Sequence, residues 1–468
     1  MENGNWEIEI GKWQDTNKIL NSELLVSNSQ FPITNYQGRF MLNTAQAKAI
    51  INKLGGTGTP PEYGIKHFTV GLDTYIRVLE DEYLDSFIRE GGSSFKMVVG
   101  SYGGGKTHFL YRIREIAWKH GYAVSYVTLS PRECPFDKLE LVYKSIMANL
   151  MHPMEEEDLT KPYEKGIDGF IRNWYVQKMD EFGKQKKIDE AINTYVKSIS
   201  GIESSSFTNA VRHAFSTLNE NIDEYERILQ WLKGEEIDHD TRYRYGITER
   251  LDKTTAFRLI RSLAQWIRAI DYSGLILLFD EAERGMSIAS SKEKRIALDN
   301  LRQIVDECGN ARLPSLAIFY AIPDERQLLD ERLEVYEALR QRLSGVLTRI
   351  NPSGVRIHLD KLELEPIPFL VELGNKLADI YEKAYPTYSF VSDILNDTIQ
   401  TFAEIAYGER YADVGYRRIF VKGIIQGFHL LRERVSSPVE KKEAEKIVRD
   451  EVRGLEEEAR RPSEEEEY

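Results

Sequence analysis

Residues 95–110, FKMVVGSYGGGKTHFL, decide how this chain folds. An apolar stretch ends in a glycine-rich turn, and the turn runs into a lysine, a hydroxyl and the start of an apolar helix face. Gly100, Gly105, Lys106 and Thr107 satisfy the pattern G-x-x-x-x-G-K-[ST], in which glycines let backbone N–H groups close around phosphate oxygens. The pattern requires a strand before it and a helix after it. Both are indicated here, so the sequence predicts a phosphate-binding loop (P-loop).

Each residue type in the loop has an expected role. We expect Lys106 to neutralise the β- and γ-phosphates and Thr107 to bind Mg²⁺, with the phosphates at the N-terminus of the following helix. Tyr102 is expected to cover the phosphates or the base, and His108 to be a packing residue. The residues expected to line the nucleotide are Gly100, Ser101, Tyr102, Gly103, Gly104, Gly105, Lys106, Thr107 and His108.

A second motif, LILLFDEAE at 275–283, ends an apolar strand in two acids. Ligands of parallel sheets collect at the carboxyl edge, so Asp280 and Glu281 are expected beside the P-loop. Asp280 would hold Mg²⁺ through water, and Glu281 would polarise the water that attacks the γ-phosphate. A simpler alternative is that the acids end the strand and cap the next helix. An N-K-x-D guanine-reading motif is absent from the sequence, so the predicted cofactors are ATP and Mg²⁺.

Composition narrows the class of protein. The 468 residues correspond to about two or three domains, and 41% are hydrophobic and 29% charged. The apolar runs are shorter than the roughly 20 residues that a membrane span needs, and the N-terminus lacks a signal-peptide pattern. We therefore expect a cytoplasmic protein without membrane contact. Cys134 and Cys308 lie far apart, outside any metal-ligand spacing, which predicts neither a disulfide nor a zinc site.

Apolar strands alternating with helices predict an α/β fold, with a parallel sheet wrapped by helices. Helical patterns fill much of the interval after residue 136 and return beyond residue 363, indicating an all-helical insertion and a C-terminal helical lid. The expected strands are 95–100, 123–129, 274–281, 315–323 and 355–360, with none between 136 and 272. The expected domains are an N-terminal arm (1–43), the ATPase core (44–362, with the insertion at 152–250), the lid (363–435) and a charged helix with an acidic tail (436–468).

Two local expectations concern the N-terminal part of the chain. Trp6, Ile8 and Ile10 alternate with acids and indicate a short edge strand in the arm. The segment after residue 43 reads as a helix with Thr44 as its N-cap and Gly55 as its end.

A P-loop, a strand ending in Asp-Glu and a helical lid resemble the AAA+ ATPases, nearest to their Orc/Cdc6-like and signal-transducing relatives. Three stretches besides LILLFDEAE resemble more closely the BrxD family of ATP-binding proteins in bacteriophage-exclusion (BREX) systems. They are KAIINKLGGTGTPPEYGIKHFTVGLD (48–73), GGSSFKMVVGSYGGGKTHFL (91–110) and LSPRECPFDKLELVYKSIMANL (129–150). The resemblance implies a P-loop AAA+ core, a role in prokaryotic anti-phage defence, a homo-oligomer, and a helicase or methyltransferase as protein partner.

The AAA+ resemblance also implies residues that complete the ATP site. A polar sensor is expected at the end of the fourth strand, but AIFYAIPDE (317–325) offers only Tyr320 nearby. Arg340 and Arg342 are candidates for an arginine offered to a neighbouring subunit, and a solvated helix face is the alternative for both. Arg417 or Arg418 would be the lid arginine that reaches the γ-phosphate. Val70 and Gly71 are expected near the adenine.

Nucleic-acid binding has weaker support. The formal net charge of -13 argues against a surface that attracts nucleic acid as a whole, although part of the excess lies in the acidic tail. Two basic clusters are candidates for touching DNA phosphates, or else are solvated faces: Lys184, Lys186 and Lys187, and Lys292, Lys294 and Arg295. Three functions stay open: an ATPase that drives assembly or remodelling on DNA, a nucleotide-gated scaffold with little turnover, and a DNA-binding loader for a helicase.

Overall fold

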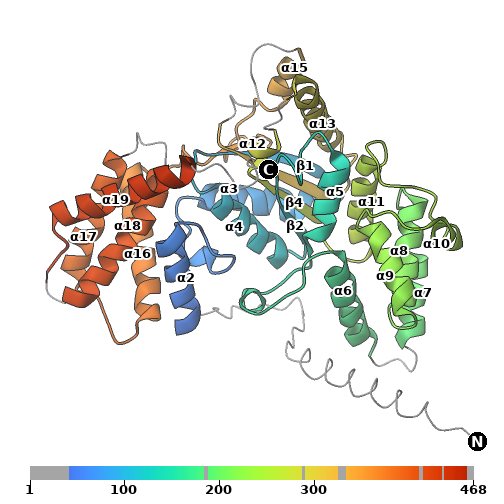
Figure 1. The fold of residues 1–468 in the computed structure, drawn as a ribbon, viewed down its shortest axis with the longest axis horizontal. Coiled ribbons are helices and arrows are strands. Elements are labelled where there is room, and N and C mark those ends of the chain that lie inside the picture. Colours follow the sequence, from blue (N-terminus) through green and yellow to red (C-terminus); the bar gives the residue numbers. More distant parts are fainter. Residues whose placement is uncertain are drawn as a thin grey trace, which may run out of the picture. The chain divides into compact units, whose positions relative to one another are not determined.

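The P-loop strand lies inside a six-stranded sheet with the order β3-β2-β4-β5-β1-β6 (Figure 1). The computed structural model describes residues 42–183, 188–286, 290–324, 334–409, 415–434 and 437–460, and every structural statement refers to these. The strands are β1 (Ser93–Val99), β2 (Ala123–Thr128), β3 (Leu150–Met151), β4 (Leu275–Asp280), β5 (Leu316–Ile322) and β6 (Arg356–His358). β3 runs antiparallel to β2, and all other pairs are parallel. The expected α/β fold with a parallel sheet is confirmed.

The register brings the two motifs to one edge of the sheet. Val99, which precedes the P-loop, pairs with Ile322 of β5, and Thr128 of β2 pairs with Asp280 at the end of β4. β5 therefore lies between the P-loop strand and the acidic strand. Because parallel strands end on the same side, the carboxyl ends of β1, β5, β4 and β2 meet where ligands of such sheets bind.

Helices cover both faces of the sheet. Along β4, Leu275, Leu277 and Phe279 belong to one buried cluster, whereas Ile276 and Leu278 belong to another, as alternation along a strand dictates. The first cluster continues into α5 (Leu139–Ala148), α11 (Ala256–Ala269) and α13 (Ser291–Gly309). The second includes α3 (Asp73–Leu79), the π-helical segment η2 (Glu80–Phe87) and the P-loop helix α4 (Lys106–Lys119).

The interval between β3 and α11 contains helices throughout its described residues. Buried aromatic residues of these helices, including Phe170, Trp174 and Phe215, belong to the same cluster as β4 and α11. The inserted helices therefore share the core of the sheet. Their bounds are η3 (Asp158–Thr160), α6 (Ile167–Phe182), α7 (Ile188–Ser198), α8 (Ser205–Thr217), α9 (Ile222–Leu232) and α10 (His239–Arg244).

Helices also follow the sheet, as expected. α16 (Pro366–Ala384), α17 (Ser392–Gly408) and α18 (Tyr416–Arg434), which we call the lid, contact one another, and α19 (Lys441–Arg460) packs on α17 and α18. Figure 1 shows that α2 (Thr44–Thr57), far away in sequence, lies beside α16 and α18. The remaining elements are η1 (Ile65–Phe68), α12 (Ala282–Gly285) and α15 (Glu334–Arg342).

Four local expectations differ from the structure or fall outside it. The N-cap of α2 is Asn43, not Thr44, because Asn43 and Gln46 bond each other's backbone N–H in a capping box. The helix runs past Gly55 and ends at Gly58, whose φ of 65° supplies the left-handed turn. β3 was not expected, since two residues are too short for a strand pattern. The proposed edge strand at Trp6 lies outside the described residues.

Candidate nucleotide-binding site

Glycines shape the P-loop between β1 and α4. Gly103 and Gly105 have φ values of 72° and 95°, which residues with a Cβ rarely adopt. A Cβ at Gly104 would lie 2.9 Å from the carbonyl oxygen of Ser101. The loop therefore needs these glycines to hold its backbone in a tight curve, and α4 begins directly after it at Lys106. The N-terminus of a 14-residue helix thus faces the loop, as anion binding requires.

Thr107 and Asp280 join the two motifs. The hydroxyl Oγ1 of Thr107 donates to Asp280 Oδ2 at 2.6 Å, and the backbone N–H of Glu281 donates to Asp280 Oδ1 at 2.9 Å. Asp280 is a buried carboxylate, with 3% of its surface exposed. A hydroxyl and a carboxylate oxygen at this distance are the hard oxygen donors that Mg²⁺ prefers, so these residues fit the expected metal.

Lys106 and Asp360 hold the loop from opposite sides. Lys106 Nζ donates to the carbonyl oxygens of Gly100 and Ser101, at 2.9 and 3.2 Å. The carboxylate of Asp360, just beyond β6, accepts from the backbone N–H of Ser101 at 2.8 Å and from its hydroxyl at 3.1 Å. The ammonium group thus lies against the loop in which phosphate binding is expected.

An apolar cavity lies beside the loop, between the segment 54–72 and the lid. The sequence predicted that Val70 and Gly71 lie near the adenine. Val70 lines this cavity, and Gly71 does not. An apolar slot beside a phosphate loop fits a purine base, whose faces are apolar. The apolar side chains of the lining are Leu54, Pro60, Phe68, Val70, Leu72, Leu359, Leu362, Phe369, Leu373 and Val421, and the rest of the lining is Gly58, Gly103, Gly104, Gly105, His108, Arg417 and Arg418.

His108 connects this cavity to the P-loop helix. Its Nε2 is hydrogen-bonded to the hydroxyl of Thr69 at 2.9 Å, and Lys376 of the lid donates to the carbonyl oxygen of Thr69 at 2.6 Å. Burial, assisted by the charges of Arg112 and Arg417, lowers the pKa of His108 to about 3. The imidazole is therefore neutral at physiological pH and ties the base-side segment to α4, which agrees with the expected packing role.

The two lid arginines have different partners. Arg417 donates to the carbonyl oxygens of Gly104 and Leu359 at 2.8 and 2.7 Å, and its Nε is buried without a hydrogen-bond partner among the described residues. Arg418 donates twice to the carbonyl oxygen of Thr57, at 3.0 and 2.7 Å. It also donates to the hydroxyl of Tyr102 at 3.0 Å. Arg417 is therefore the better placed of the pair to meet a phosphate, while Arg418 anchors the lid to the end of α2.

Glu281 lies at the strand end with an unusual backbone. Its φ of 51° is rare for a residue with a side chain and is a form of strain that concentrates at functional sites. The carboxylate oxygen Oε2 accepts from Arg284 Nη1 at 2.7 Å, and both side chains are partly exposed. The expected water-activating group thus lies next to Asp280 but is held in an ion pair.

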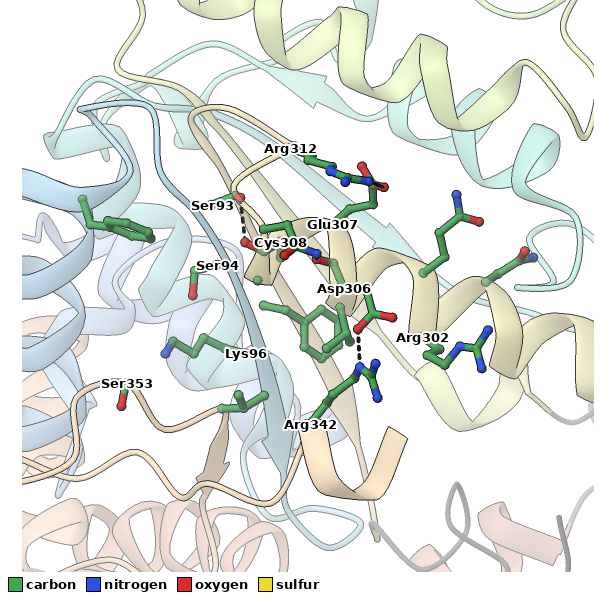
Figure 2. A pocket seen from close by; sticks show the side chains of 18 of the residues that line it. Ser93, Ser94, Lys96, Arg302, Asp306, Glu307, Cys308, Arg312, Arg342 and Ser353 are labelled. Carbon is green, nitrogen blue, oxygen red and sulfur yellow. Dashed lines mark hydrogen bonds and ion pairs between the residues drawn. The ribbon is translucent and has the colours of Figure 1, made fainter. Parts of the chain in front are cut away.

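The remaining candidates lie elsewhere. Figure 2 shows Arg342 directed at Asp306, with which it pairs, in a cleft of about 970 Å³ that the N-terminal half of β1 and α13 line. Arg340 is exposed and pairs with Glu337 at 3.0 Å. Tyr320, the only polar candidate for the sensor, is fully buried, and its hydroxyl donates to the carbonyl oxygen of Ala282 at 3.4 Å.

The basic clusters are only partly within the described residues. Lys292 and Arg295 are exposed at the start of α13, and Lys294 is half-buried. Lys184, Lys186 and Lys187 lie outside the residues that the structure describes.

Sequence reasoning missed three residues of this site. Asp360 carries a signal that was available, an acid at the end of a strand, as for Asp280. Tyr126, whose hydroxyl donates to Asp280 Oδ2 at 2.6 Å, lies in an ordinary strand pattern that gives no such signal. Gly415 directly precedes α18, and a Cβ there would lie 2.3 Å from the carbonyl oxygen of Tyr102.

Comparison with known protein families decides the relationship. The profile of the family described as BREX system ATP-binding protein BrxC/D matches residues 42–445. The chain belongs to this family. It is therefore an ATP-binding protein of a phage-exclusion system, and the resemblance inferred from the P-loop and the acidic strand is confirmed. A search of curated proteins finds no significant match.

Among solved structures, one similar chain is the ORC2 protein of Aeropyrum pernix, determined as ADPNP-ADP complexes. The identity is 12% and the TM-score 0.41, over 82% of this chain and 68% of that chain. Within the described ranges, no helix combines the length and the apolar character that crossing a membrane requires. The same ranges contain no cluster of three or more His, Cys, Asp or Glu residues suited to a metal ion.

Proposed function

We propose that this BREX-family protein binds Mg²⁺ together with ATP at the P-loop, hydrolyses the nucleotide, and uses the cycle to assemble or remodel a complex on DNA. The observation that carries the proposal is the 2.6 Å hydrogen bond between Thr107 and Asp280, with Glu281 as the next residue. It joins a phosphate-binding loop to an acidic strand end. A P-loop that only bound a nucleotide would not need a second acid at this position.

Each side chain has a defined task in this proposal. The N–H groups of the loop and Lys106 bind the phosphates, and Thr107 and Asp280 hold the metal. Mg²⁺, when bound there, would supply positive charge to the phosphate oxygens. Glu281 would accept a proton from the attacking water. Arg417 would move from the carbonyl oxygens of Gly104 and Leu359 to the γ-phosphate, so that ATP and ADP set different lid positions.

A nucleotide-gated scaffold with little turnover is the second candidate. The ion pair between Glu281 and Arg284 favours it, because the guanidinium occupies a carboxylate oxygen that would otherwise be available to the attacking water. The end of β5 favours it as well, since Tyr320 is turned into the core. In this case the protein would bind ATP, change the lid contact and recruit a helicase or methyltransferase without rapid hydrolysis.

Steady-state ATP hydrolysis over a series of protein concentrations separates the candidates. Wild type is measured beside Glu281→Gln, with and without DNA and at low and high salt, because phosphate contacts weaken with salt. Turnover per subunit that rises with protein concentration and disappears in Glu281→Gln would support an ATPase assembled as a homo-oligomer. Stimulation by DNA would identify DNA as the partner.

The opposite results are equally informative. If wild type binds ATP but hydrolyses it no faster than Glu281→Gln under every condition, the ATPase proposal fails and the scaffold becomes the better account. If ATP does not bind, both the ATPase proposal and the scaffold alternative fail. Salt-sensitive DNA binding that needs ATP but not hydrolysis would favour a loader.

A further inference from the structure

Among the described residues, the carboxylate of Asp280 accepts three hydrogen bonds, and one comes from a residue outside both nucleotide motifs. The N–H of Glu281 binds Oδ1, whereas Thr107 and Tyr126 both donate to Oδ2, each at 2.6 Å. The contacts of Thr107 and Glu281 follow from the motifs themselves. Tyr126 comes from β2, the strand on the far side of β4 from the P-loop strand. Its contact therefore requires an explanation of its own.

The sheet fixes where the phenol lies. Tyr126 pairs with Leu278, and Thr128 pairs with Asp280. Paired residues of parallel strands share a face, and so do residues two apart on one strand, so Tyr126, Leu278 and Asp280 project to the same side. That side is the one covered by α4, the P-loop helix. The tyrosine is long enough to reach two residues forward to the carboxylate.

A second tyrosine packs against the phenol. The rings of Tyr111, on α4, and Tyr126 have centroids 5.0 Å apart. The guanidinium of Arg114 lies 4.5 Å from the ring centroid of Tyr111. Tyr126 is thus held by a neighbouring ring of the P-loop helix as well as by its bond to Asp280.

The hydroxyl of Tyr126 is the donor in its bond to Asp280, because a carboxylate oxygen can only accept a hydrogen bond.

We propose that Tyr126 is a positioning residue for the metal, whose hydroxyl holds the Asp280 carboxylate in the orientation that Mg²⁺ and Thr107 require. The proposal rests on the proposed function of the P-loop site and concerns its metal dependence. A ligand needs a fixed orientation to bind well, and removing a residue that orients a metal-binding group lowers metal affinity or activity by about 10- to 100-fold. Thr107 is on the P-loop, which the nucleotide itself contacts, whereas Tyr126 belongs to the sheet. The sheet would thus orient Asp280 independently of the nucleotide.

The ring of Tyr126 also lines a polar cavity. The cavity has a volume of about 330 Å³, and its lining includes Tyr126, Thr128, Glu133 and Lys165 but not Asp280. Tyr126→Phe removes the hydrogen bond to Asp280 and keeps the ring, so this substitution tests the hydroxyl without opening the packing around it.

The test compares nucleotide affinity with and without Mg²⁺ in the full-length protein. A fluorescent ATP analogue is titrated in EDTA and in Mg²⁺ for wild type, Tyr126→Phe and the control Tyr122→Phe. Tyr122 precedes the same strand at its opposite end, and its hydroxyl donates to the carbonyl oxygen of Leu84 at 2.6 Å, far along β2 from the metal site. We expect equal affinity in EDTA for all three proteins, and a half-saturating Mg²⁺ concentration about tenfold higher in Tyr126→Phe alone.

For each protein, the ratio of its nucleotide affinity in Mg²⁺ to its affinity in EDTA keeps the test decisive. A variant with a reduced folded fraction loses affinity in EDTA and in Mg²⁺ alike, so its ratio is unchanged. An unchanged ratio and Mg²⁺ requirement in Tyr126→Phe would overturn the proposal, as would an equal change in Tyr122→Phe. If wild type itself binds the analogue without any effect of Mg²⁺, the proposed metal-dependent function fails instead, so the two failures are distinguishable.

Discussion

Arg417 and Arg418 are neighbours in sequence, but their contacts assign them different work. Arg418 is 9% exposed and carries two hydrogen bonds to Thr57 at the end of α2. Arg417 carries bonds to Gly104 and Leu359 at the site itself. The sequence predicts that one of the pair reads the nucleotide but cannot choose between them, because both lie in the first turn of the same helix.

Alanine at each position should separate these roles. For Arg418→Ala we expect the free energy of unfolding to fall by about 1 to 3 kcal/mol, since the carbonyl oxygen of Thr57 loses its donors. For Arg417→Ala we expect a comparable loss of stability, since the carbonyl oxygens of Gly104 and Leu359 lose a donor, and in addition a drop in ATP affinity of about tenfold with ADP affinity nearly unchanged. Denaturant unfolding and calorimetric titration with both nucleotides would measure this. Equal loss of ATP and ADP affinity in Arg417→Ala would contradict the assignment.

Lys96 is a buried charge outside the site and gives a prediction about pH. Its Nζ donates to the hydroxyl of Tyr83 at 2.6 Å and to the carbonyl oxygen of Gly354 at 2.7 Å, beside the cleft in Figure 2. Burial lowers its pKa from 10.5 to about 7. Between these values the unfolded chain binds one more proton than the folded protein, so this residue makes stability rise with pH.

Lys96→Met should remove that contribution. Relative to the variant, wild type should gain up to about 1.4 kcal/mol of unfolding free energy per pH unit between pH 7.5 and 9.5. Urea unfolding at several pH values measures the difference, and Lys119→Met, at a lysine whose side chain is 72% exposed, serves as control. Parallel stability curves for wild type and Lys96→Met would refute the prediction.

At the scale of elements, the lid comes close to the P-loop at Gly415. A Cβ on Gly415 would lie 2.3 Å from the carbonyl oxygen of Tyr102 and 3.0 Å from the carbonyl carbon of Gly103. Here backbone atoms lie against backbone atoms, so rotating a side chain cannot relieve the clash. The start of α18, and with it Arg417, is thereby placed at a fixed distance from the phosphate loop.

Gly415→Ala should separate these two elements. We expect ATP affinity to fall about tenfold while the sheet and the lid helices remain folded, because the clash is relieved by moving the lid turn away. Gly408→Ala, at the end of α17, is the matched control, since a Cβ there meets nothing within 4 Å. The same fluorescent titration reports affinity, and circular dichroism reports helix content. Wild-type affinity in Gly415→Ala would show that the close approach is not needed.

The sequence predicts the elements that carry a local pattern, but not the residues whose roles depend on contacts between distant segments. β1, α4 and β4 follow from local patterns, apolar runs followed by glycines or acids, and they hold four of the site residues: Lys106, Thr107, Asp280 and Glu281. Tyr126 and Gly415 could not be predicted, because their roles depend on which strand pairs with β4 and on where the lid turn returns. The end of α2 was misplaced because Gly55 and Gly56 resemble a stop, whereas the left-handed turn falls at Gly58.

At the scale of the whole molecule, the inserted helices share their core with the sheet. Trp174 of α6 donates from its indole N–H to the carbonyl oxygen of Ile270 at 3.0 Å, and Tyr143 of α5 donates to Leu232 of α9 at 3.0 Å. The inserted helices and β4 therefore belong to one packed core.

The arginines of α15 are the candidates for a residue offered to a neighbouring subunit. Arg342 pairs with Asp306 and Arg340 with Glu337, and all four side chains are at least one-third exposed. Exposed ion pairs of this kind are worth about 0 to 1 kcal/mol, so either arginine can leave its partner for a neighbouring subunit at little cost. Neither is placed at the P-loop of its own chain. If one of them completes a neighbour's site, loss of activity should be repaired by mixing.

The experiment combines two inactive proteins. Lys106→Ala keeps the arginines but cannot bind the phosphates, and Arg342→Ala binds ATP but cannot complete a neighbour's site. Alone, each should hydrolyse ATP at least about tenfold more slowly than wild type, whereas a mixture should regain activity at interfaces that join an intact P-loop to an intact arginine. Arg340→Ala, tested the same way, identifies which arginine acts. Recovery with neither variant would mean that no arginine of α15 is supplied by a neighbouring subunit, because a group acting within its own chain cannot be replaced by another.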